Sequence, residues 1–410
     1  MKIETQKLAA GLSDLQISWI DRPEALVPLR PEWKNLADRV AADPFATPDW
    51  CAAWWRHFNS GRKLQCLIAR ENGALVAVLP FCLEMHWIGA LPLRIARLAG
   101  IDPHCIIFQL ASEAHVLRQV LQAALGHLIG DIRCDAVSFT PVSELSGHLS
   151  VLRGLCAEEP GFAACDQAAG SHVIFDLPDR FDEFLKRLSK KRSSQFRRDL
   201  HGLGEAFDMM ATKISPDARA FDDFVHLHNQ QWQAVGRGGH FVDWPGSVAF
   251  HLDVLRESDG LQLHVLNGTV DEDSAIPLAS QFVLEASGRA HWRLPARRID
   301  SIAERLSIGK VGLLLMIRQL IDDGVTLIEA GRGDYSYKLD YGGRSVPVHR
   351  LIVIPETPAG RMRLQLLLGW SDLLNLLYYR VWFLKLAPRL RKATGGKPRP
   401  LWRLWIRSRL

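Results

Sequence analysis

The stretch Val325-Thr326-Leu327-Ile328-Glu329-Ala330-Gly331-Arg332-Gly333-Asp334-Tyr335-Ser336-Tyr337-Lys338 joins an apolar run to a polar loop. Residues 325–329 have the pattern of a buried β-strand, and two glycines follow it. The loop then supplies a carboxylate, two phenols and an ammonium at one sheet edge, where proteins often place binding and catalytic groups. The alternative interpretation is a solvated turn that closes a βα unit.

Composition indicates a globular protein rather than a disordered one. The chain has 410 residues, of which 48% are hydrophobic and 23% charged, enough for two domains and a tail. Its seven cysteines show no C-x-x-C spacing, which favours reduced thiols and a cytoplasmic location. His226 and His228 are two residues apart, so they would lie on different faces of a helix, and no metal site is expected.

Charge is divided unevenly along the chain. Residues 361–410 hold twelve Lys or Arg and one acid, Asp372, a local charge of +11. Because the whole chain has a net charge of +5, residues 1–360 carry −6. An acidic body argues against nucleic acid as a partner, and a basic tail favours an acidic surface such as anionic lipid.

Hydrophobic periodicity predicts two α/β halves, with a boundary near residue 165. In the first half we expect a helix at 45–58, a hairpin at 64–83, a helix at 113–128, a strand at 136–139 and a further helix after Pro141. In the second half we expect a strand at 173–175, a long basic helix at 181–203 and a helix at 218–234. A helix near 247–256, strands at 261–267, 277–285 and 289–294, a helix at 307–321 and strands at 325–329 and 346–354 complete it. Both halves contain a hairpin, a helix and a strand in the same order, which suits two related modules.

The start of the helix expected at 307–321 has the composition of a phosphate-binding site. Its residues Arg305, Ser307, Gly309, Lys310 and Gly312 offer two cations, a hydroxyl that can cap the helix and two glycines that let a ligand approach. Taken alone, a glycine-containing helix start is a common feature.

A second cationic stretch lies at residues 186–198, which contain seven Lys or Arg in thirteen residues. Arg192 and Arg197 belong to it. The ordinary interpretation is a solvated helix face, and the alternative is a rim for an anionic substrate such as a nucleotide-linked sugar.

Five motifs in order resemble a known family: T-P-x-W, K-K-R-S-S-x-F-R-R, L-H-x-x-x-W, a G-x-x-G helix start and G-R-G-D-x-x-Y-K. Over roughly residues 40–355 the chain resembles the FemAB-related GNAT acyltransferases called CelD-like or cellulose-biosynthesis-type acetyltransferases. The resemblance implies an α/β fold of tandem GNAT-like modules with mixed central sheets. The expected limits are an N-terminal module at 1–165, an acyltransferase module at 166–358 and a basic amphipathic helical tail at 359–410.

The same resemblance implies roles for particular residues. The part of the family that binds the coenzyme A pyrophosphate is matched by Arg305, Ser307, Gly309, Lys310 and Gly312. The implied co-substrate is acetyl-CoA. His228 and Trp232 match L-H-x-x-x-W. Asp334, Tyr337 and Lys338 match the terminal D-x-x-Y-K. The chain departs from the family in lacking the fuller Q-x-x-G-x-G/A pattern and in having Glu329 where relatives usually have Asp.

Acyl transfer requires a base for the acceptor, a donor to the developing oxyanion and a proton for the departing thiolate. Asp334 or His228 is the expected base and Tyr337 the expected acid. Lys338 is expected to bind a phosphate or carboxylate, or to pair with Asp334, and Arg332, Arg192, Arg197 and Trp232 are further candidates for substrate binding. For His228 the competing interpretation is a helix histidine with satisfied hydrogen bonds, and for Trp232 a core residue.

The apolar stretch at 364–387 is interrupted by charged and polar residues, among them Asp372, Arg380 and Lys385. Each central charge would cost a spanning helix about 2.5–3.5 kcal/mol, so we predict an interfacial amphipathic helix. The alternatives are a helix packed on the enzyme body and a basic pocket for a cyclic dinucleotide.

The sequence therefore predicts a bacterial acyltransferase, cytoplasmic or peripheral on the inner membrane, that acetylates an amino sugar or another intermediate of exopolysaccharide or surface polysaccharide. A sugar or lipid-linked saccharide would be its substrate. The alternatives are a Fem-like transferase that uses aminoacyl-tRNA and a non-catalytic, membrane-docked scaffold or signal-binding module.

Overall fold

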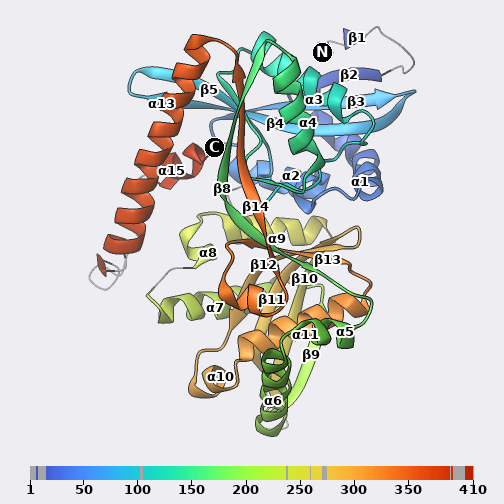
Figure 1. Cartoon of the computed structure of the whole chain (residues 1–410), viewed down its shortest axis with the longest axis vertical. Helices are drawn as coiled ribbons and strands as arrows, with labels where there is room; N and C mark the ends of the chain where they lie inside the picture. Colours follow the sequence, from blue (N-terminus) through green and yellow to red (C-terminus); the bar gives the residue numbers. More distant parts are fainter. Residues whose placement is uncertain are drawn as a thin grey trace. The chain divides into compact units, whose positions relative to one another are not determined.

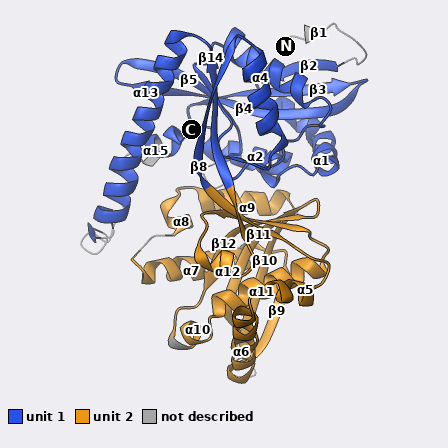
Figure 2. Cartoon of the chain, viewed as in Figure 1, with its two compact units in different colours: residues 1–170, 347–410 blue, residues 171–346 orange. Residues whose placement is uncertain are grey.

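The polypeptide forms two compact units, residues 1–170 with 347–410 (unit 1) and residues 171–346 (unit 2), which Figure 2 shows in separate colours. The computed structural model describes residues 6–7, 15–101, 105–236, 239–258, 260–269, 275–387, 389–390 and 402–409. The chain passes between the units twice, once inside strand β8 and once inside strand β14. Residues 347–358, expected in the second module, thus belong to unit 1, because this part of β14 pairs with strands of unit 1.

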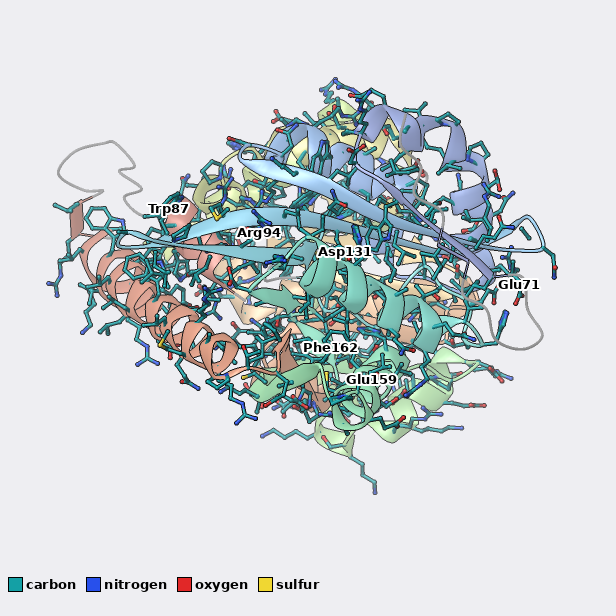
Figure 3. All side chains as sticks on the ribbon, turned by 90° about the horizontal axis from the view of Figure 1, so that it is seen from above. Glu71, Trp87, Arg94, Asp131, Glu159 and Phe162 are labelled. Carbon is teal, nitrogen blue, oxygen red and sulfur yellow. The ribbon has the colours of Figure 1, made fainter. Side chains whose placement is uncertain are left out.

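Unit 1 is built on long antiparallel strands. Its strands are β1 (Gln6–Lys7), β2 (Leu15–Ile20), β3 (Arg62–Glu71), β4 (Ala74–Ile88), β5 (Leu91–Leu98), β6 (Ala136–Ser138), β7 (Val142–Ser143) and parts of β8 (Phe162–Asp176) and β14 (Arg344–Pro355). The hairpin expected at 64–83 is formed by β3 and β4, which turn at Asn72 and Gly73. Glu71 ends β3 and Trp87 lies near the far end of the 15-residue strand β4. Figure 3 accordingly shows the two residues at opposite ends of the hairpin.

Helices cover unit 1 on its faces (Figure 1). They are η1 (Pro23–Leu29), α1 (Arg30–Arg39), η2 (Pro44–Ala46), α2 (Pro48–Phe58), α3 (Leu117–Leu125), the π-helix η3 (Gly126–Asp131) and α4 (Gly147–Glu158). The tail adds α13 (Pro358–Leu374), the π-helix η4 (Asn375–Leu386) and α15 (Trp402–Ser408). Leu364, Leu367 and Leu368 of α13 pack on Leu93 and Ile95 of β5, so the tail helix is anchored to the sheet by burial of apolar surface.

Unit 2 contributes the remaining strands of one mixed sheet, which has 14 strands in the described residues. The strands of unit 2 are the end of β8, then β9 (Asp208–Ile214), β10 (Leu261–Thr269), β11 (Ala275–Ala286), β12 (Arg289–Arg297), β13 (Leu327–Arg332) and the start of β14. Its helices are α5 (Phe181–Arg187), α6 (Lys190–Ala206), α7 (Ala218–Ala234), α8 (His240–Asp243), α9 (Ser247–Glu257), α10 (Ser301–Arg305), α11 (Ile308–Asp322) and α12 (Ser336–Asp340).

The single basic helix expected at 181–203 is two helices. The first helix, α5, ends at Arg187. Ser189 is the N-cap of α6, since its hydroxyl accepts a hydrogen bond from the amide of Arg192 at 3.3 Å. Strands β5 and β9 were not predicted, whereas α7, α9, β10, β11 and β12 agree with the expected elements within a few residues.

The two units repeat one topology. In unit 1 the order β2-β3-β4-β5 is antiparallel and β5 then pairs in parallel with β6; in unit 2 the order β9-β10-β11-β12 is antiparallel and β12 pairs in parallel with β13. A helix, α3 or α11, connects the two parallel strands in each case. The last strand of each set pairs further with a strand that runs through both units, since β13 pairs with residues 172–176 of β8 and β6 pairs with residues 352–353 of β14. The structure therefore confirms a mixed α/β fold of two related modules.

Candidate functional site

Strands β12 and β13 run together for only three residue pairs. Arg289 pairs with Leu327, Ala290 with Ile328 and His291 with Glu329, after which β12 continues to Arg297 and β13 to Arg332 with no further ladder pair between them in the described residues. The outer part of β12 instead bonds to helix α7: the Pro295 carbonyl accepts from His228, and the Arg297 amide donates to Gln231. The sheet of unit 2 thus opens between two parallel strands.

A buried carboxylate lies at the last pair before this opening. Glu329 is 3% exposed, and its Oε1 accepts hydrogen bonds from His172 Nδ1 of β8 at 3.0 Å and from the Gly331 amide at 2.9 Å. His291 of β12 lies on its other side, with Nδ1 3.8 Å from Oε2. Burial alone would raise the pKa of Glu329, but the two histidines lower it to about 2. Glu329 is therefore an ionised carboxylate that connects three strands.

The loop after β13 has the conformation that its glycines require. Gly331 and Gly333 both have left-handed backbone angles, with φ of +72° and +91°, and a side chain at Gly333 would meet the Tyr335 ring at 2.8 Å. The loop is shorter than predicted, because helix α12 begins at Ser336. Tyr337 and Lys338 consequently stand on a helical turn, while Asp334 is exposed in the loop.

Lys338 is buried although it carries a charge. Its ammonium donates to the Ala330 carbonyl at 2.5 Å and lies 5.8 Å from the centre of the Trp292 ring and 5.3 Å from that of Tyr335. Burial lowers its pKa to about 8, against the attraction of Glu329. The predicted salt bridge to Asp334 is not among the ion pairs of the described residues, so Lys338 is held by carbonyl oxygens and aromatic rings instead.

Tyr337 belongs to the same cluster. Its ring stacks on Tyr335 with centroids 6.1 Å apart and meets Trp292 edge-on at 6.3 Å. Burial, with a smaller effect of Tyr335, raises its pKa to about 12. The phenol therefore stays protonated at neutral pH and can serve as a hydrogen-bond donor.

The first turn of α11 has a more specific construction than the sequence suggested. Ser307 precedes the helix with φ +49°, a conformation uncommon outside glycine, and it makes no side-chain cap. A Cβ atom on Gly309 would lie 2.8 Å from Cδ of Arg297, and one on Gly312 would lie 2.8 Å from Ala279 of β11. The two glycines thus give room to Arg297 and to the sheet.

This packing brings Arg297, at the end of β12, against a helix N-terminus. Lys310 is half-buried on the same turn and Arg305 is exposed on α10 just before it. The first amides of a helix point out of its N-terminus with a partial positive charge, so these residues together suit a phosphate or pyrophosphate. The sequence analysis did not find Arg297; the signal available was a cation at the end of a strand that leads into this loop.

His228 has little freedom to act as a base. It is 1% exposed, its Nδ1 donates to the Pro295 carbonyl at 2.9 Å, and its Nε2 accepts from the His240 amide at 3.3 Å. Burial lowers its pKa to about 4. Both nitrogens of a neutral ring are thus in use, which argues for a histidine that positions α7 on β12. Trp232, beside it, packs over Gly239.

The remaining predicted binding residues lie elsewhere. Arg192 forms an ion pair with Asp340 and stands 5.8 Å from the centre of the Tyr341 ring, so it holds α6 against α12. Arg197 is exposed on α6, and Arg332 is half-buried at the end of β13. In the part of the chain that is described, no group of three His, Cys, Asp or Glu side chains is arranged to hold a metal ion.

In unit 1 the described chain after β5 is bound at the corresponding place. After the β5–β6 pairs, Ile107 forms a parallel bridge with Val142 of β7, and the Asp43 carboxylate accepts from the amides of Phe108 and Gln109 at 2.6 and 2.8 Å. These bonds hold residues 107–109 beside β7 and Asp43. The candidate site described above lies in unit 2.

Comparison with known proteins agrees with this location. Residues 189–339 match the family described as acetyltransferase (GNAT) domain, and this range includes β12, α11, β13 and Lys338. Unit 2 carries a GNAT domain. The chain is accordingly an enzyme of the GNAT acyltransferase type. GNAT domains generally use acetyl-CoA.

One solved structure resembles most of the chain in fold, and two others match it at lower scores. The crystal structure of FemX is 11% identical, with a TM-score of 0.56, over 78% of this chain and 95% of that one. L-PGS from Bacillus licheniformis is 9% identical over 83% and 94% of the two chains, with a TM-score of 0.49. A tandem GNAT protein from the clavulanic acid biosynthesis pathway is 15% identical over 83% and 99%, with a TM-score of 0.42. None of the curated proteins compared with the chain matches it.

The carboxylate that connects three strands leads to a prediction about stability. Because its pKa in the folded state, about 2, lies below the ordinary value of 4.5, Glu329 stabilises the fold above pH 4.5 and loses this contribution as the pH falls toward 2. We expect Glu329→Gln to lower the thermal midpoint at neutral pH, and the difference from wild type to shrink in acid. Thermal unfolding between pH 7 and pH 3 measures this. A difference that is the same at both ends of the range would show that the charge of Glu329 is not what matters.

Proposed function

We propose that the chain transfers an acyl group from acyl-CoA to an amine or hydroxyl of a sugar intermediate in bacterial surface polysaccharide. The observation that carries the acyl-CoA part is the opening between β12 and β13, with Arg297 and the first turn of α11 at one end and Lys338, Tyr337 and Trp292 at the other. The proposed acceptor is supported by the sequence resemblance to CelD-like acetyltransferases.

The arrangement can bind both ends of acyl-CoA, with its phosphate groups at one end and its thioester at the other. The α11 start, together with Arg297, Lys310 and Arg305, offers cations and helix amides to phosphate groups, as predicted for this loop. The apolar and aromatic cluster next to Glu329 excludes water, which strengthens any charge interaction made there. Ser307 precedes this turn, Gly309 gives Arg297 the room to approach it, and Gly312 lets it pack on Ala279 of β11.

The chemistry assigns one task to each polar group of the loop. The acceptor nitrogen or oxygen forms a bond to the acyl carbon, the carbon–sulfur bond breaks, and the thiol and the acylated acceptor leave. Asp334, an exposed carboxylate, takes the proton of the acceptor directly or through water. The Tyr337 phenol donates to the sulfur, and the Lys338 ammonium stabilises negative charge on the acyl oxygen.

A second candidate is a Fem-like transferase that uses aminoacyl-tRNA. It is supported by the fold shared with FemX over 95% of that chain and by the exposed cations of α6, among them Arg197. Both reactions have an activated acyl donor, so the cluster around Lys338 suits either. The donor that binds decides between them.

Calorimetric titration with acetyl-CoA tests the donor. We expect saturable binding, and we expect Arg297→Gln to weaken it about ten- to a hundredfold, since a charge-assisted hydrogen bond contributes about 1.5–3 kcal/mol. The matched control is Arg318→Gln, an exposed arginine farther along α11. Binding of acetylpantetheine, which lacks the phosphates of coenzyme A, should not respond to Arg297→Gln.

Absence of acetyl-CoA binding at millimolar ligand would overturn the proposal. Binding of aminoacyl-tRNA in its place would establish the Fem-like candidate. If neither donor bound, the fold would serve as a scaffold or signal-binding module.

The Lys338 ammonium leads to a prediction about pH. Its pKa of about 8 means that the charged form dominates below pH 8, so kcat/KM should fall as the pH rises through about 8. Lys338→Met should remove most activity, and Lys338→Arg should retain part of it with the alkaline fall shifted upward, because guanidinium stays charged. The measurement is the rate of thiol release against pH. An unshifted fall in Lys338→Arg would mean that another group titrates.

The proton carriers are tested by two conservative substitutions. Asp334→Asn and Tyr337→Phe should fold normally, because Asp334 is exposed and a phenylalanine keeps both ring contacts of Tyr337. Each should lower kcat by roughly 10²- to 10⁴-fold, the usual contribution of acid–base catalysis. Tyr335→Phe, on the exposed neighbour, is the control. Wild-type rates in both variants would show that the loop is structural.

A further inference from the structure

The tail helix has apolar residues on two opposite faces. Its inner face is buried on unit 1 and includes Leu364, Leu367, Leu368, Leu374 and Tyr378. Six large apolar residues lie exposed on the outside: Met362, Leu366, Leu373, Leu376, Leu377 and Leu384. We call this second set the outer face. A row of exposed apolar side chains opposite a buried face indicates contact with something outside this chain.

The outer face is presented by a fixed element. Trp405 of α15 packs on Tyr378 and Tyr379, with ring centroids 5.0 and 5.9 Å apart, and its Nε1 donates to Asn375 at 3.4 Å. Arg97 of β5 in turn donates to the carbonyls of Arg407 and Arg409, at 3.1 and 2.9 Å. The expected alternative of a helix packed on the enzyme body is therefore right for the inner face, and it leaves the outer face exposed.

Cations accompany the outer face and indicate what covers it. Arg380 and Lys385 of η4 are exposed, as is Arg389 beyond it, and none of the three forms an ion pair within the described residues. Arg361 and Arg363 are different, since they pair with Glu356 and Asp135. Asp372 is the single acid in residues 361–410. Apolar side chains between unpaired cations match a surface of apolar chains under anionic headgroups.

We propose that the outer face docks unit 1 on an anionic lipid bilayer, with the helix lying in the plane of the interface. No helix among the described residues is long and apolar enough to cross a membrane. In this orientation Leu373, Leu376, Leu377 and Leu384 enter the boundary of the acyl chains, while Arg380 and Lys385 extend to the headgroups. Each cation near the surface contributes about a fivefold increase in partitioning. A second copy of this chain fits less well, because two tails of +11 would repel each other.

Co-sedimentation of the full chain with lipid vesicles tests the docking. We expect binding to vesicles of equal parts phosphatidylglycerol and phosphatidylcholine, and much weaker binding to phosphatidylcholine alone. Binding should fall at about 1 M salt, where the screening length is about 3 Å. The double variant Leu376→Glu with Leu377→Glu should lose at least tenfold in partitioning. Arg380→Glu with Lys385→Glu should lose a similar factor on anionic vesicles.

The matched control is Val27→Glu, which makes the same apolar-to-acidic change at a residue of unit 1 that is 60% exposed and lies outside the tail. It should bind vesicles like wild type. Thermal melting of each variant shows whether the fold is kept. Acetyl-CoA binding by the leucine double variant should be unchanged, so failure of docking is distinguishable from failure of the proposed reaction.

Three results would overturn the docking. The first is no vesicle binding by wild type, and the second is equal binding by wild type and the leucine double variant. The third is light scattering that shows a wild-type dimer which the leucine double variant dissolves, with no vesicle binding by either. That result would assign the outer face to a second copy of the chain.

Discussion

The buried carboxylate of Glu329 is the interaction on which the site depends. It sits at the last pair of the β12–β13 ladder, and it accepts hydrogen bonds from His172 of β8 and from the amide of Gly331. Through these bonds β13 stays fixed to β8 while β12 is free to turn toward α7, where His228 and Gln231 bind it. The opening between two parallel strands is thus stabilised on both sides. Without such bonds a gap in a sheet would leave buried backbone groups unsatisfied.

The two units share one topology but differ, in the described residues, at the place where two parallel strands can part. Each unit has four antiparallel strands, a helix and a fifth parallel strand, so each has the same place where two strands can part. In unit 1 the segment near Ile107 is bound to β7 and to Asp43. The second and fifth residues of α3 are Arg118 and Leu121, where α11 has Gly309 and Gly312. One topology therefore provides both a framework module and a module with a site.

The sequence was sufficient to predict local features, and insufficient for contacts between distant segments. Two glycines before Asp334 predict a special loop, because the backbone requirement is local, and both have the expected left-handed angles. His172, in contrast, contacts Glu329 across a sequence separation of 157 residues, and no local sequence pattern at either residue predicts this hydrogen bond. Ser189 explains the break in the basic helix, yet a serine inside a cationic run is a weak signal until the cap is seen. The packing role of Gly309 likewise depends on Arg297, which arrives from another strand.

The placement of Lys338 is costly for the fold, and this cost indicates a function. An ammonium that is 5% exposed loses most of its hydration, and its hydrogen-bond partners are the neutral carbonyls of Ala330 and Gly333. The Glu329 carboxylate attracts it without forming an ion pair, and the pKa of Lys338 still falls to about 8. A leucine or methionine there would pack against Trp292 with no loss of hydration. A cation kept under such conditions, beside an opening in the sheet, is best explained by an interaction with an anion or a developing negative charge that enters the opening.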